Sequence, residues 1–540
     1  MIGSVMAAAV PMSDGTRGVL LTVFLVFLTA TLFFCLFVGP EKDQADAFYL
    51  GGGRSGPFVM VLALVGVCLP TSTVLGTTGT ISLFGYDGMF ITLSVLLSLA
   101  LLLILARPLR HHGRFTIGDV FARWGRAPRV AAGIVALAVC LPLLMFELAS
   151  VGLNTALLFG LTGSGARSVF TIMIGVLIIS ATAFGGMRCA TALQVVKGVL
   201  MFAACAVVVV LVMRELHFSP GSLLQAAQSG SEQPRAFVSQ GLSKDPWDSD
   251  AIGTADFVGL QMTIILGMAA MPHVVMRVNT ISGNAAGATA VRRAMQVVAA
   301  FAVGAMIIGL GAAALVGREQ IAAVDPGGAG ALLLLSASLG GGTMTSAGAA
   351  VFILVACALF VTVLAATASV TLAAAAAVAH DIYWRGHGEK KTREGSEVTV
   401  ARWAATGMGV AATALAVAAR DENIQQLTTL SLAVAASSLL PALVYSLFWR
   451  GYTRRGLLWT LYGGMGTTVV LLLSSPAFSG TPSALFPARH FDWFPLESVG
   501  LVSVPISFLL GYLVSVLDGA GSGGSVETHE MPPSSAPAAR

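Results

Sequence analysis

The chain has 540 residues, of which 56% are hydrophobic and only 10% are charged. A soluble globular protein carries about 25% charged residues, so this composition excludes a water-soluble protein with an ordinary charged surface. The net charge of +4 is small and spread along the chain, which gives no support for nucleic acid as a partner. The apolar residues come in blocks about as long as the ~20 residues that a helix needs to cross a bilayer. The predicted fold is therefore an all-α polytopic membrane protein, surrounded by lipid.

Motifs for cofactors and metals are missing from the sequence. No glycine-rich phosphate loop and no HExxH motif occurs. The six cysteines are isolated residues in or beside apolar segments, without zinc-ligand spacing or a disulfide framework. No cofactor, no metal site and no enzyme activity are predicted.

Thirteen apolar segments are long enough to span a membrane as helices. They cover residues 18–38, 57–84, 89–106, 130–161, 168–187, 191–213, 256–276, 294–316, 346–380, 400–419, 426–448, 457–474 and 499–517. The first is too long for the core of a signal peptide and is interpreted as a retained span. This predicts an external N-terminal segment (1–17), a transmembrane domain (18–518) and a disordered cytoplasmic tail (519–540).

Lysine and arginine are distributed unequally between alternate loops. With the N-terminus outside, 22 of the 30 basic residues fall on the inner side and eight on the outer side. A cluster of arginines between residues 107 and 129 contributes most to this bias, and its simplest role is to fix the topology. The positive-inside rule then predicts an N-terminus outside and a C-terminus in the cytoplasm. The protein is expected in the plasma membrane of a bacterium.

Two spans contain helix-breaking residues deep within them. Gly66 and Pro70 lie in the second span, and Gly267 and Pro272 lie in the seventh. Proline removes a backbone donor, which a membrane tolerates only where the freed groups face protein or a wet cavity. One such helix is readily explained as a simple kink. Two of them, each opening a set of five spans, favour an inverted repeat with a midplane binding site.

Short motifs in the first two thirds of the chain are similar to those of one transporter family. They are residues 48–54 (FYLGGGR), 85–88 (GYDG), 113–120 (GRFTIGDV), 185–187 (GGM) followed by Gln194 and Lys197, 266–277 (LGMAAMPHVVMR) and 380–383 (HDIY). In this order and spacing they resemble the sodium:solute symporter family, within it the cation–acetate and monocarboxylate permeases. The resemblance implies thirteen spans, a five-plus-five inverted-repeat core (about 57–213 and 256–448) and cation-driven uptake of small solutes.

The sequence departs from that family where a coupling ion is expected. The acidic residue of the first broken helix is replaced by Val67, and a hydroxyl pair of the ninth span is replaced by Ala365 and Ala366. Hydroxyls occur nearby, but they are rotated around the helix; they are Thr367, Ser369 and Thr371. Sodium prefers several hard oxygen ligands, so these replacements argue against a sodium site with side-chain ligands.

Glu147 is the clearest acidic residue within a predicted span. A carboxylate facing lipid costs about 2.5–3.5 kcal/mol at the membrane centre, so Glu147 is expected to face the bundle, on a stripe with Ser150 and Asn154. It is either a proton-binding coupling residue or a structural acid near the helix end. His273, directly after Pro272, is more simply a packing or capping residue.

The predicted function is that of a secondary symporter for a small monocarboxylate such as acetate, propionate or pyruvate, working by alternating access. The substrate anion is expected at Thr71, Ser72, Thr73, Gly267, Met271 and Pro272. The coupling cation, either Na⁺ or H⁺, is expected at Gly66, Val67, Pro70, Glu147, Thr367, Ser369 and Thr371. The alternatives are a carrier of the same fold for another solute, a transporter-like sensor and a membrane enzyme. The oligomeric state is left open.

The predicted topology has a direct test. In a variant without its native cysteines, single cysteines in the loop between spans six and seven and in the C-terminal tail are labelled with an impermeant reagent. We expect labelling of the first from outside only and of the second from inside only. Labelling of both from the same side would contradict the thirteen-span arrangement.

Overall fold

The structure is a computed structural model that describes residues 14–38, 45–51, 56–159, 161, 164–231, 233–242, 250–279, 285–383, 394–419, 425–481, 484–486 and 489–521. Its helices in the first half are α2 (Asp14–Phe37), α3 (Ala45–Leu50), α4 (Pro57–Cys68), α5 (Thr71–Phe84), α6 (Tyr86–His112), α7 (Ile117–Phe121), η1 (Ala122–Trp124), α8 (Arg126–Leu158), α9 (Ser164–Glu215), α10 (Pro220–Ser229), α11 (Pro234–Phe237), α12 (Asp250–Ala269) and α13 (Pro272–Asn279). Those in the second half are α14 (Ala285–Leu315), α15 (Arg318–Val324), α16 (Ala331–Ser338), η2 (Leu339–Gly341), α17 (Ser346–Ala376), η3 (Ala377–Tyr383), α18 (Glu394–Ala418), α19 (Gln425–Val434), η5 (Ala435–Leu439), α20 (Leu440–Phe448), α21 (Arg454–Leu473) and α22 (Gly500–Gly521).

The all-α membrane fold is confirmed. Eleven helical stretches of the described chain are long and apolar enough to cross a membrane, and the bent pair α4–α5 makes a twelfth span. The 24-residue helix α2 coincides with the first predicted segment. Within α9, Gly186 has a φ of 54° and separates the two predicted spans on either side of it. The external segment up to residue 13, residues 52–54 of the first motif and the tail from residue 522 lie outside the described residues.

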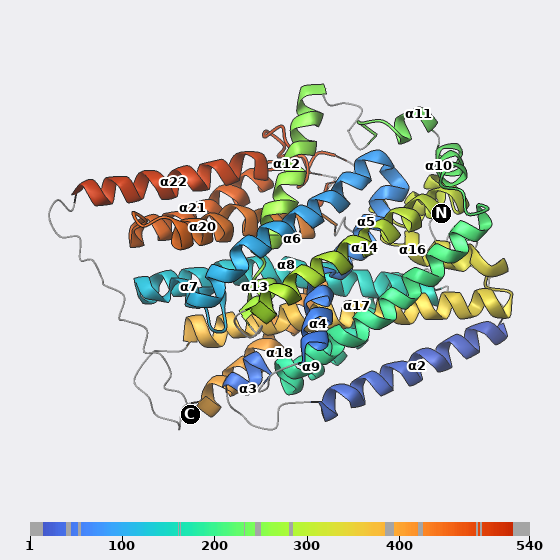
Figure 1. The fold of residues 1–540 in the computed structure, drawn as a ribbon, viewed down its shortest axis with the longest axis horizontal. Coiled ribbons are helices and arrows are strands. Elements are labelled where there is room, and N and C mark those ends of the chain that lie inside the picture. Colours follow the sequence, from blue (N-terminus) through green and yellow to red (C-terminus); the bar gives the residue numbers. More distant parts are fainter. Residues whose placement is uncertain are drawn as a thin grey trace.

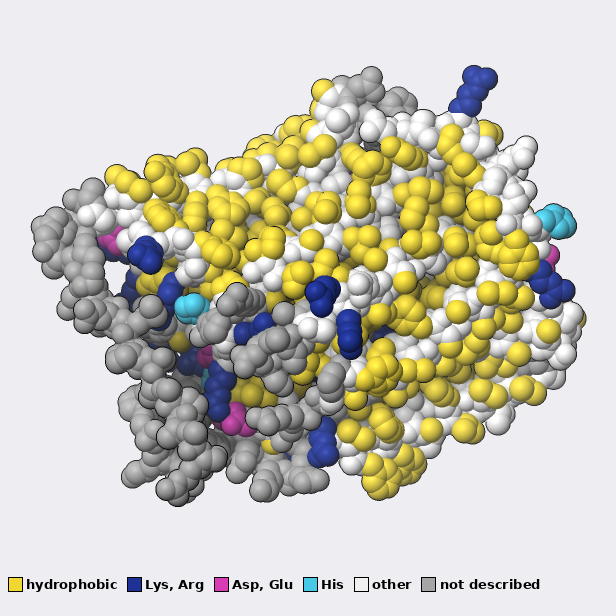
Figure 2. Space-filling model, viewed as in Figure 1, with side chains coloured by type: hydrophobic (Ala, Val, Ile, Leu, Met, Phe, Trp, Pro, Cys, Tyr) yellow, Lys and Arg dark blue, Asp and Glu magenta, His cyan; other side chains and the backbone are white. Residues whose placement is uncertain are grey.

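The long helices run roughly side by side (Figure 1). Helix α2 begins at the right of this view and α22 ends at the left, so the described bundle starts and finishes at opposite ends. Hydrophobic side chains cover most of the visible surface, while Lys and Arg gather mainly over its left half (Figure 2). Apolar side chains such as Ile104, Val176 and Leu517 are more than half exposed, as expected for a surface that faces lipid.

Both predicted helix interruptions are present. Helices α4 and α5 meet at an angle of 55° across Leu69 and Pro70. Helices α12 and α13 are separated at Ala270 and Met271. Helix α13 packs against α4 and α17, so the two interruptions belong to neighbouring elements of the core. The inverted-repeat boundaries themselves stay a prediction.

Glycines allow several backbones to approach more closely than a Cβ atom permits. A Cβ at Gly79 of α5 would lie 2.4 Å from the carbonyl oxygen of Gly328, in the turn before α16. In contrast, a Cβ at Gly76, one turn earlier on α5, meets no atom within 4 Å. The short helix α16 was not predicted from the sequence, and its packing on α5 depends on this glycine contact.

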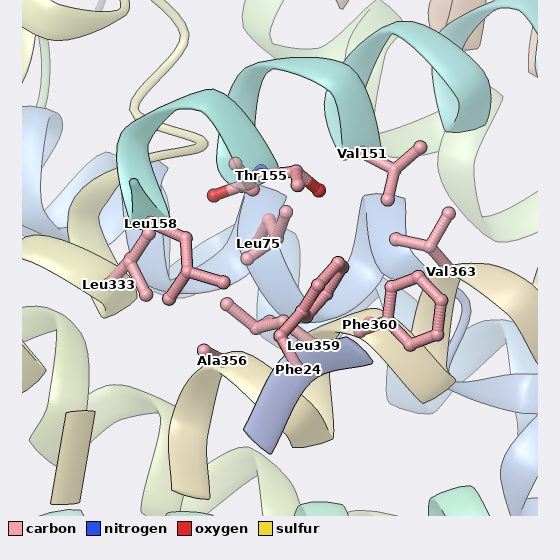
Figure 3. Close-up of a pocket in the computed structure, with 11 residues that line it drawn as sticks. Phe24, Leu75, Val151, Thr155, Leu158, Leu333, Ala356, Leu359, Phe360 and Val363 are labelled. Carbon is pink, nitrogen blue, oxygen red and sulfur yellow. The ribbon is translucent and has the colours of Figure 1, made fainter. Parts of the chain in front are cut away.

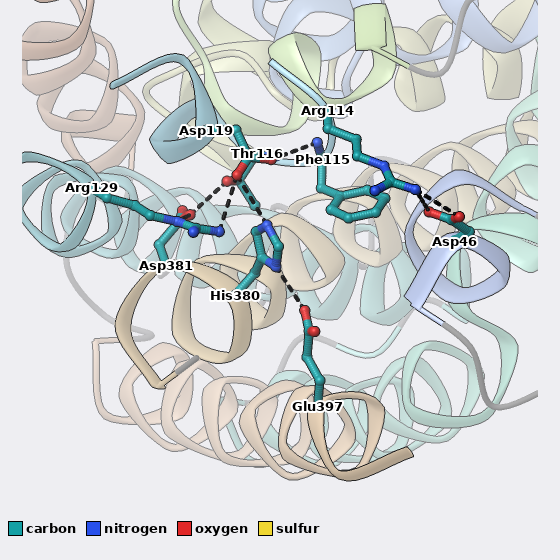
Figure 4. A network of polar contacts seen from close by, with 9 residues as sticks. All are labelled: Asp46, Arg114, Phe115, Thr116, Asp119, Arg129, His380, Asp381 and Glu397. Carbon is teal, nitrogen blue, oxygen red and sulfur yellow. Dashed lines mark hydrogen bonds and ion pairs between the residues drawn. The ribbon is translucent and has the colours of Figure 1, made fainter. Parts of the chain in front are cut away.

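A cluster of charged side chains joins four elements, α7, α8, η3 and α18 (Figure 4). This His380 cluster consists of Thr116, Asp119, Arg129, His380, Asp381 and Glu397. His380 places Nε2 3.0 Å from Asp119 and Nδ1 2.8 Å from Glu397. Because both partners are carboxylates, both ring nitrogens act as donors, which requires the imidazolium form. Arg129 donates to Asp119 at 3.0 Å and to Asp381 at 3.2 Å.

Asp119 holds this cluster to the backbone as well. Its Oδ2 accepts hydrogen bonds from the amides of Phe115 at 2.8 Å and Thr116 at 3.2 Å, at the start of α7. Burial alone raises the pKa of Asp119, but His380, Arg129 and the Phe115 amide together outweigh it and lower that pKa from 3.8 to about 2. Two of the sequence motifs, GRFTIGDV and HDIY, therefore meet in one ion-pair network.

Replacing glycine by alanine at two positions of α5 tests the close contact with α16. We expect Gly79→Ala to destabilise the protein by about 1–3 kcal/mol, because the new methyl group overlaps a backbone carbonyl that has no room to move. Gly76→Ala is the matched control, and it should be neutral or slightly stabilising because alanine favours the helix. Thermal unfolding of both variants in detergent measures the difference, and equal Tm values would contradict the packing.

The lowered pKa of Asp119 predicts a pH dependence of stability. A depressed carboxyl pKa stabilises the folded state at pH values above the unfolded pKa, near 3.8, and this contribution is lost as the pH falls towards 2. We therefore expect Asp119→Asn to lower Tm at pH 7 through the loss of roughly 2 kcal/mol. The gap to the wild type should narrow below pH 4. Asp46→Asn, in the exposed Asp46–Arg114 pair, is the control and should have little effect.

Candidate functional site

The interruption between α4 and α5 leaves two backbone carbonyls without helical partners. The carbonyl of Gly66 would normally accept from the amide four residues later, but that residue is Pro70, which has no N–H. The amide of Thr73 bonds to Pro70 at 3.0 Å, so it does not reach the carbonyl of Leu69. The proline thus creates a pair of acceptors inside the membrane core.

Lys197 of α9 donates hydrogen bonds to both of these acceptors. Its ammonium group donates to the carbonyl of Gly66 at 2.8 Å and to the carbonyl of Leu69. The side chain is only 1% exposed. The 22 basic residues counted on the inner side include Lys197, and counting it there was wrong, because the residue lies inside the helix bundle. Arg277 is likewise buried, so neither residue contributes to the charge bias of the surface.

Gln194, one helical turn before Lys197, forms hydrogen bonds to α17. Its Nε2 donates to the carbonyl of Ala365 at 3.0 Å and to the hydroxyl of Ser369 at 2.9 Å. A Cβ at Gly66 would lie 2.3 Å from the amide oxygen of Gln194, so glycine is required for this approach. Residues 194 and 197 share one face of α9, and together they connect the interrupted helix to α17.

Glu147 of α8 lies on the other side of the interruption. Its carboxylate is completely buried, and it lies against the first residues of α5, Thr71 and Ser72. A helix N-terminus has unpaired amides and a partial positive charge, which favour an anion. Neither oxygen of Glu147 has a partner in regular hydrogen-bond geometry among the described residues. Lys197 is close enough to interact with the carboxylate electrostatically.

The predicted hydroxyls of the ninth span have different surroundings. Thr367 bonds to the carbonyl of Val363 in its own helix at 2.7 Å, as hydroxyls in spans commonly do. Ser369 is brought to Gln194, as described above. Thr371 is buried, and its hydroxyl has no partner within the described chain. The structure thus joins only Ser369 to the residues around the first interruption.

The residues predicted at the second interruption are mainly packed against protein. A Cβ at Gly267 would lie 2.4 Å from the carbonyl oxygen of Leu432 in α19, so this glycine serves close packing. Met271 and Pro272 are buried, as are Val67 and Pro70 at the first interruption. His273 is buried too, and its Nδ1 has no partner in the described part of the chain.

Two small pockets flank α5. The larger, with about 340 Å³ of empty space, lies between α2, α5, α8, α16 and α17 (Figure 3). Its wall is mainly aliphatic and aromatic, with polar groups from Asn154 and Thr155. Val151 and Asn154, in the wall of this pocket, belong to the same stripe of α8 as Glu147. The second pocket, of about 220 Å³, is lined by Leu69 and by the hydroxyl residues Thr73, Thr77 and Thr92.

Lys197 and Gln194 are the site residues that the sequence reasoning missed. The available signal was a lysine inside an apolar span, since intramembrane charges are functional candidates by default. Among the described residues, no group of three His, Cys, Asp or Glu side chains is arranged to hold a metal ion.

Comparisons with known proteins agree with the architecture. Two solved structures share the fold. A Na⁺-coupled sialic acid symporter in a substrate-bound, outward-open state matches with a TM-score of 0.68 and 14% identity, covering 92% of this chain and 98% of the other. MhsT in complex with L-phenylalanine matches with a TM-score of 0.51 and 15% identity, covering 86% of this chain and 100% of the other.

Two relatives are similar along most of their sequence. A monocarboxylic acid transporter of Corynebacterium glutamicum is 32% identical over 529 residues, covering 95% of this chain and 94% of the relative. The uncharacterized symporter YwcA of Bacillus subtilis is 30% identical over 505 residues, covering 92% and 94%. Residues 48–464 match the sodium:solute symporter family. This chain therefore belongs to the sodium:solute symporter family.

Proposed function

We propose that the protein is a symporter that takes up a small monocarboxylate, of the acetate, propionate or pyruvate type, together with a proton. Its family and its structural neighbours are transporters, which supports transport rather than catalysis. The name of the Corynebacterium relative supports a monocarboxylate as the substrate class. The distribution of basic residues supports a plasma-membrane location with the N-terminus outside and the C-terminus in the cytoplasm.

The observation that carries the proposal is the position of Glu147 at the N-terminus of α5. The unpaired amides there and the hydroxyl of Thr71 suit a carboxylate. The hydroxyl of Thr71 is buried and lies beside the Glu147 carboxylate. The apolar pocket along α8 suits the short hydrocarbon part of such a substrate, with Asn154 and Thr155 at its wall. In this proposal the carboxylate of the substrate binds beside Thr71 and Ser72.

Glu147 then links the substrate to a proton. Two ionised carboxylates at one helix end repel each other strongly, so one of them binds a proton when both are present. A proton on Glu147 removes its charge and lets the substrate anion interact with the α5 amides. Release of the substrate restores the attraction between those amides and ionised Glu147, which releases the proton. Lys197 and Glu147 lie close to one another, while His273 and Cys68 are the other titratable groups near Lys197.

The substrate class is tested by counterflow in proteoliposomes loaded with unlabelled acetate. We expect labelled acetate to accumulate transiently inside, and external propionate or pyruvate to compete with it. Proline and glucose should not compete with acetate. Proline carries a second charge beside its carboxylate, and glucose has no carboxylate. Counterflow of one of these solutes instead of acetate would assign the carrier to another substrate.

Glu147→Gln tests the proton step separately. Glutamine keeps the size of the side chain but cannot release a proton, so accumulation driven by a pH gradient should fall at least tenfold. Equilibrative exchange of labelled acetate should stay within a few-fold of the wild type, since no net proton movement is needed. Glu319→Gln, at an exposed position of helix α15, is the matched control. Normal pH-driven accumulation by Glu147→Gln would contradict proton coupling through this residue.

A further inference from the structure

The carbonyl pair at the first interruption is a place where a small cation would bind. The oxygens of Gly66 and Leu69 lie inside the helix bundle, and the missing N–H of Pro70 leaves the first of them without a helical donor. Across from them, the carbonyl of Ala365 and the hydroxyl of Ser369 point at Gln194. Backbone carbonyls and hydroxyls are the hard oxygen ligands that alkali and alkaline-earth cations prefer.

We infer that Lys197 takes the place of a dissociable metal cation at these carbonyls, so that the interruption between α4 and α5 is held by a cation belonging to the chain itself. The ammonium group makes two of the contacts that such an ion would make, to Gly66 and Leu69. Gln194 makes the contacts on the α17 side, to Ala365 and Ser369. This deepens the proposed symport function by excluding this position as a sodium site.

Two features exclude a sodium ion while Lys197 is in place. The first is charge, because a second cation within a few ångströms of a buried ammonium group is repelled in a medium of low dielectric constant. The second is the number of ligands. Ala365 and Ala366 supply no side-chain oxygen, and the carbonyls of Gly66 and Leu69 are already occupied. Affinity for a hard cation falls as ligands are removed.

The surroundings of Lys197 supply partners for an ammonium group. The side chain is nearly fully buried and comes from a helix, α9, that packs directly against α4 and α17. Glu147, on α8, supplies a negative charge within electrostatic reach. An ammonium group with carbonyl acceptors and a nearby carboxylate has the partners that a buried cation requires.

The test measures sodium-specific stabilisation of the purified protein in detergent, without substrate. Tm is recorded for the wild type in NaCl and in choline chloride at equal ionic strength, and we expect no difference. In Lys197→Met the carbonyls lose their donor and become accessible to a metal ion. A ligand that binds only the folded state raises Tm, so NaCl should raise the Tm of this variant in a saturable manner by about 2 °C.

Arg277→Met is the matched control, because it also removes a buried cation, whose guanidinium group donates to the hydroxyl of Thr191. Its Tm should not depend on sodium. A saturable, sodium-specific rise in the Tm of the wild type would overturn the inference, and this measurement holds even if Lys197→Met does not fold. A folded Lys197→Met protein without a sodium response would overturn it as well.

The transport assay distinguishes this inference from the proposed function. Wild-type proteoliposomes should accumulate labelled acetate equally in sodium and choline media at a fixed pH gradient. If acetate shows no counterflow at all, the substrate assignment fails, but the Tm comparison still decides the role of Lys197. If acetate is transported and accumulation follows the sodium gradient, with wild-type Tm rising in sodium, the substrate assignment stands and the inference about Lys197 fails.

Discussion

The architecture of the core depends on one missing backbone donor, the N–H of Pro70. In hydrocarbon an unsatisfied carbonyl costs several kcal/mol, so the Gly66 oxygen needs a partner from another helix. Lys197 supplies that partner, and the contact joins residues 131 positions apart in the sequence. The same side chain also reaches Leu69, so one ammonium group satisfies both acceptors on the α4 side of the bend. Helix α9 is thereby tied to the bend, and the glycine at residue 66 lets Gln194 approach closely enough to tie α17 to the same place.

The two charges at the bend have different kinds of partners, and this decides what each can do. Lys197 is held by fixed carbonyls at hydrogen-bonding distance, so its position is set by the backbone. Glu147 lies at a helix N-terminus without a regular hydrogen bond to any described residue. The two fixed carbonyls set the position of the Lys197 ammonium group, whereas Glu147 lies against the first residues of α5, where an anionic substrate would also bind. We therefore propose a structural role for Lys197 and an exchangeable proton on Glu147.

Local sequence features predicted much of this arrangement. Apolar length gave the spans, and the glycine–proline pairs located both interruptions, because these properties act within one helix. The burial of Glu147 also followed from the cost of exposing a carboxylate to lipid. The partner of the first interruption could not be predicted in the same way. Which side chain reaches Gly66 depends on how α9 packs on α4, and no local pattern encodes that packing. For the same reason the sequence could not show that Ser369, but not Thr371, contacts Gln194. Helical periodicity does not show which neighbouring helix each hydroxyl faces.

A cation that is part of the chain changes what the site contributes to transport. A dissociable ion brings energy from its own gradient each time it binds and leaves, because its binding is linked to one conformation. A lysine side chain stabilises the interrupted helix in the same manner, but it has no gradient and supplies none of that energy. At an effective dielectric constant of 20, like charges 4 Å apart repel by about 4 kcal/mol. A metal cation therefore cannot bind at the carbonyls beside the ammonium group of Lys197. The energy for accumulating the substrate must therefore enter through a different group in the core.

Glu147 is a buried acid that faces the same bend. The helix end that it occupies is also where an anionic substrate is best stabilised. In the mechanism we propose, substrate and proton are coupled through competition for one helix N-terminus, and Lys197 holds the bend in place of a dissociable ion.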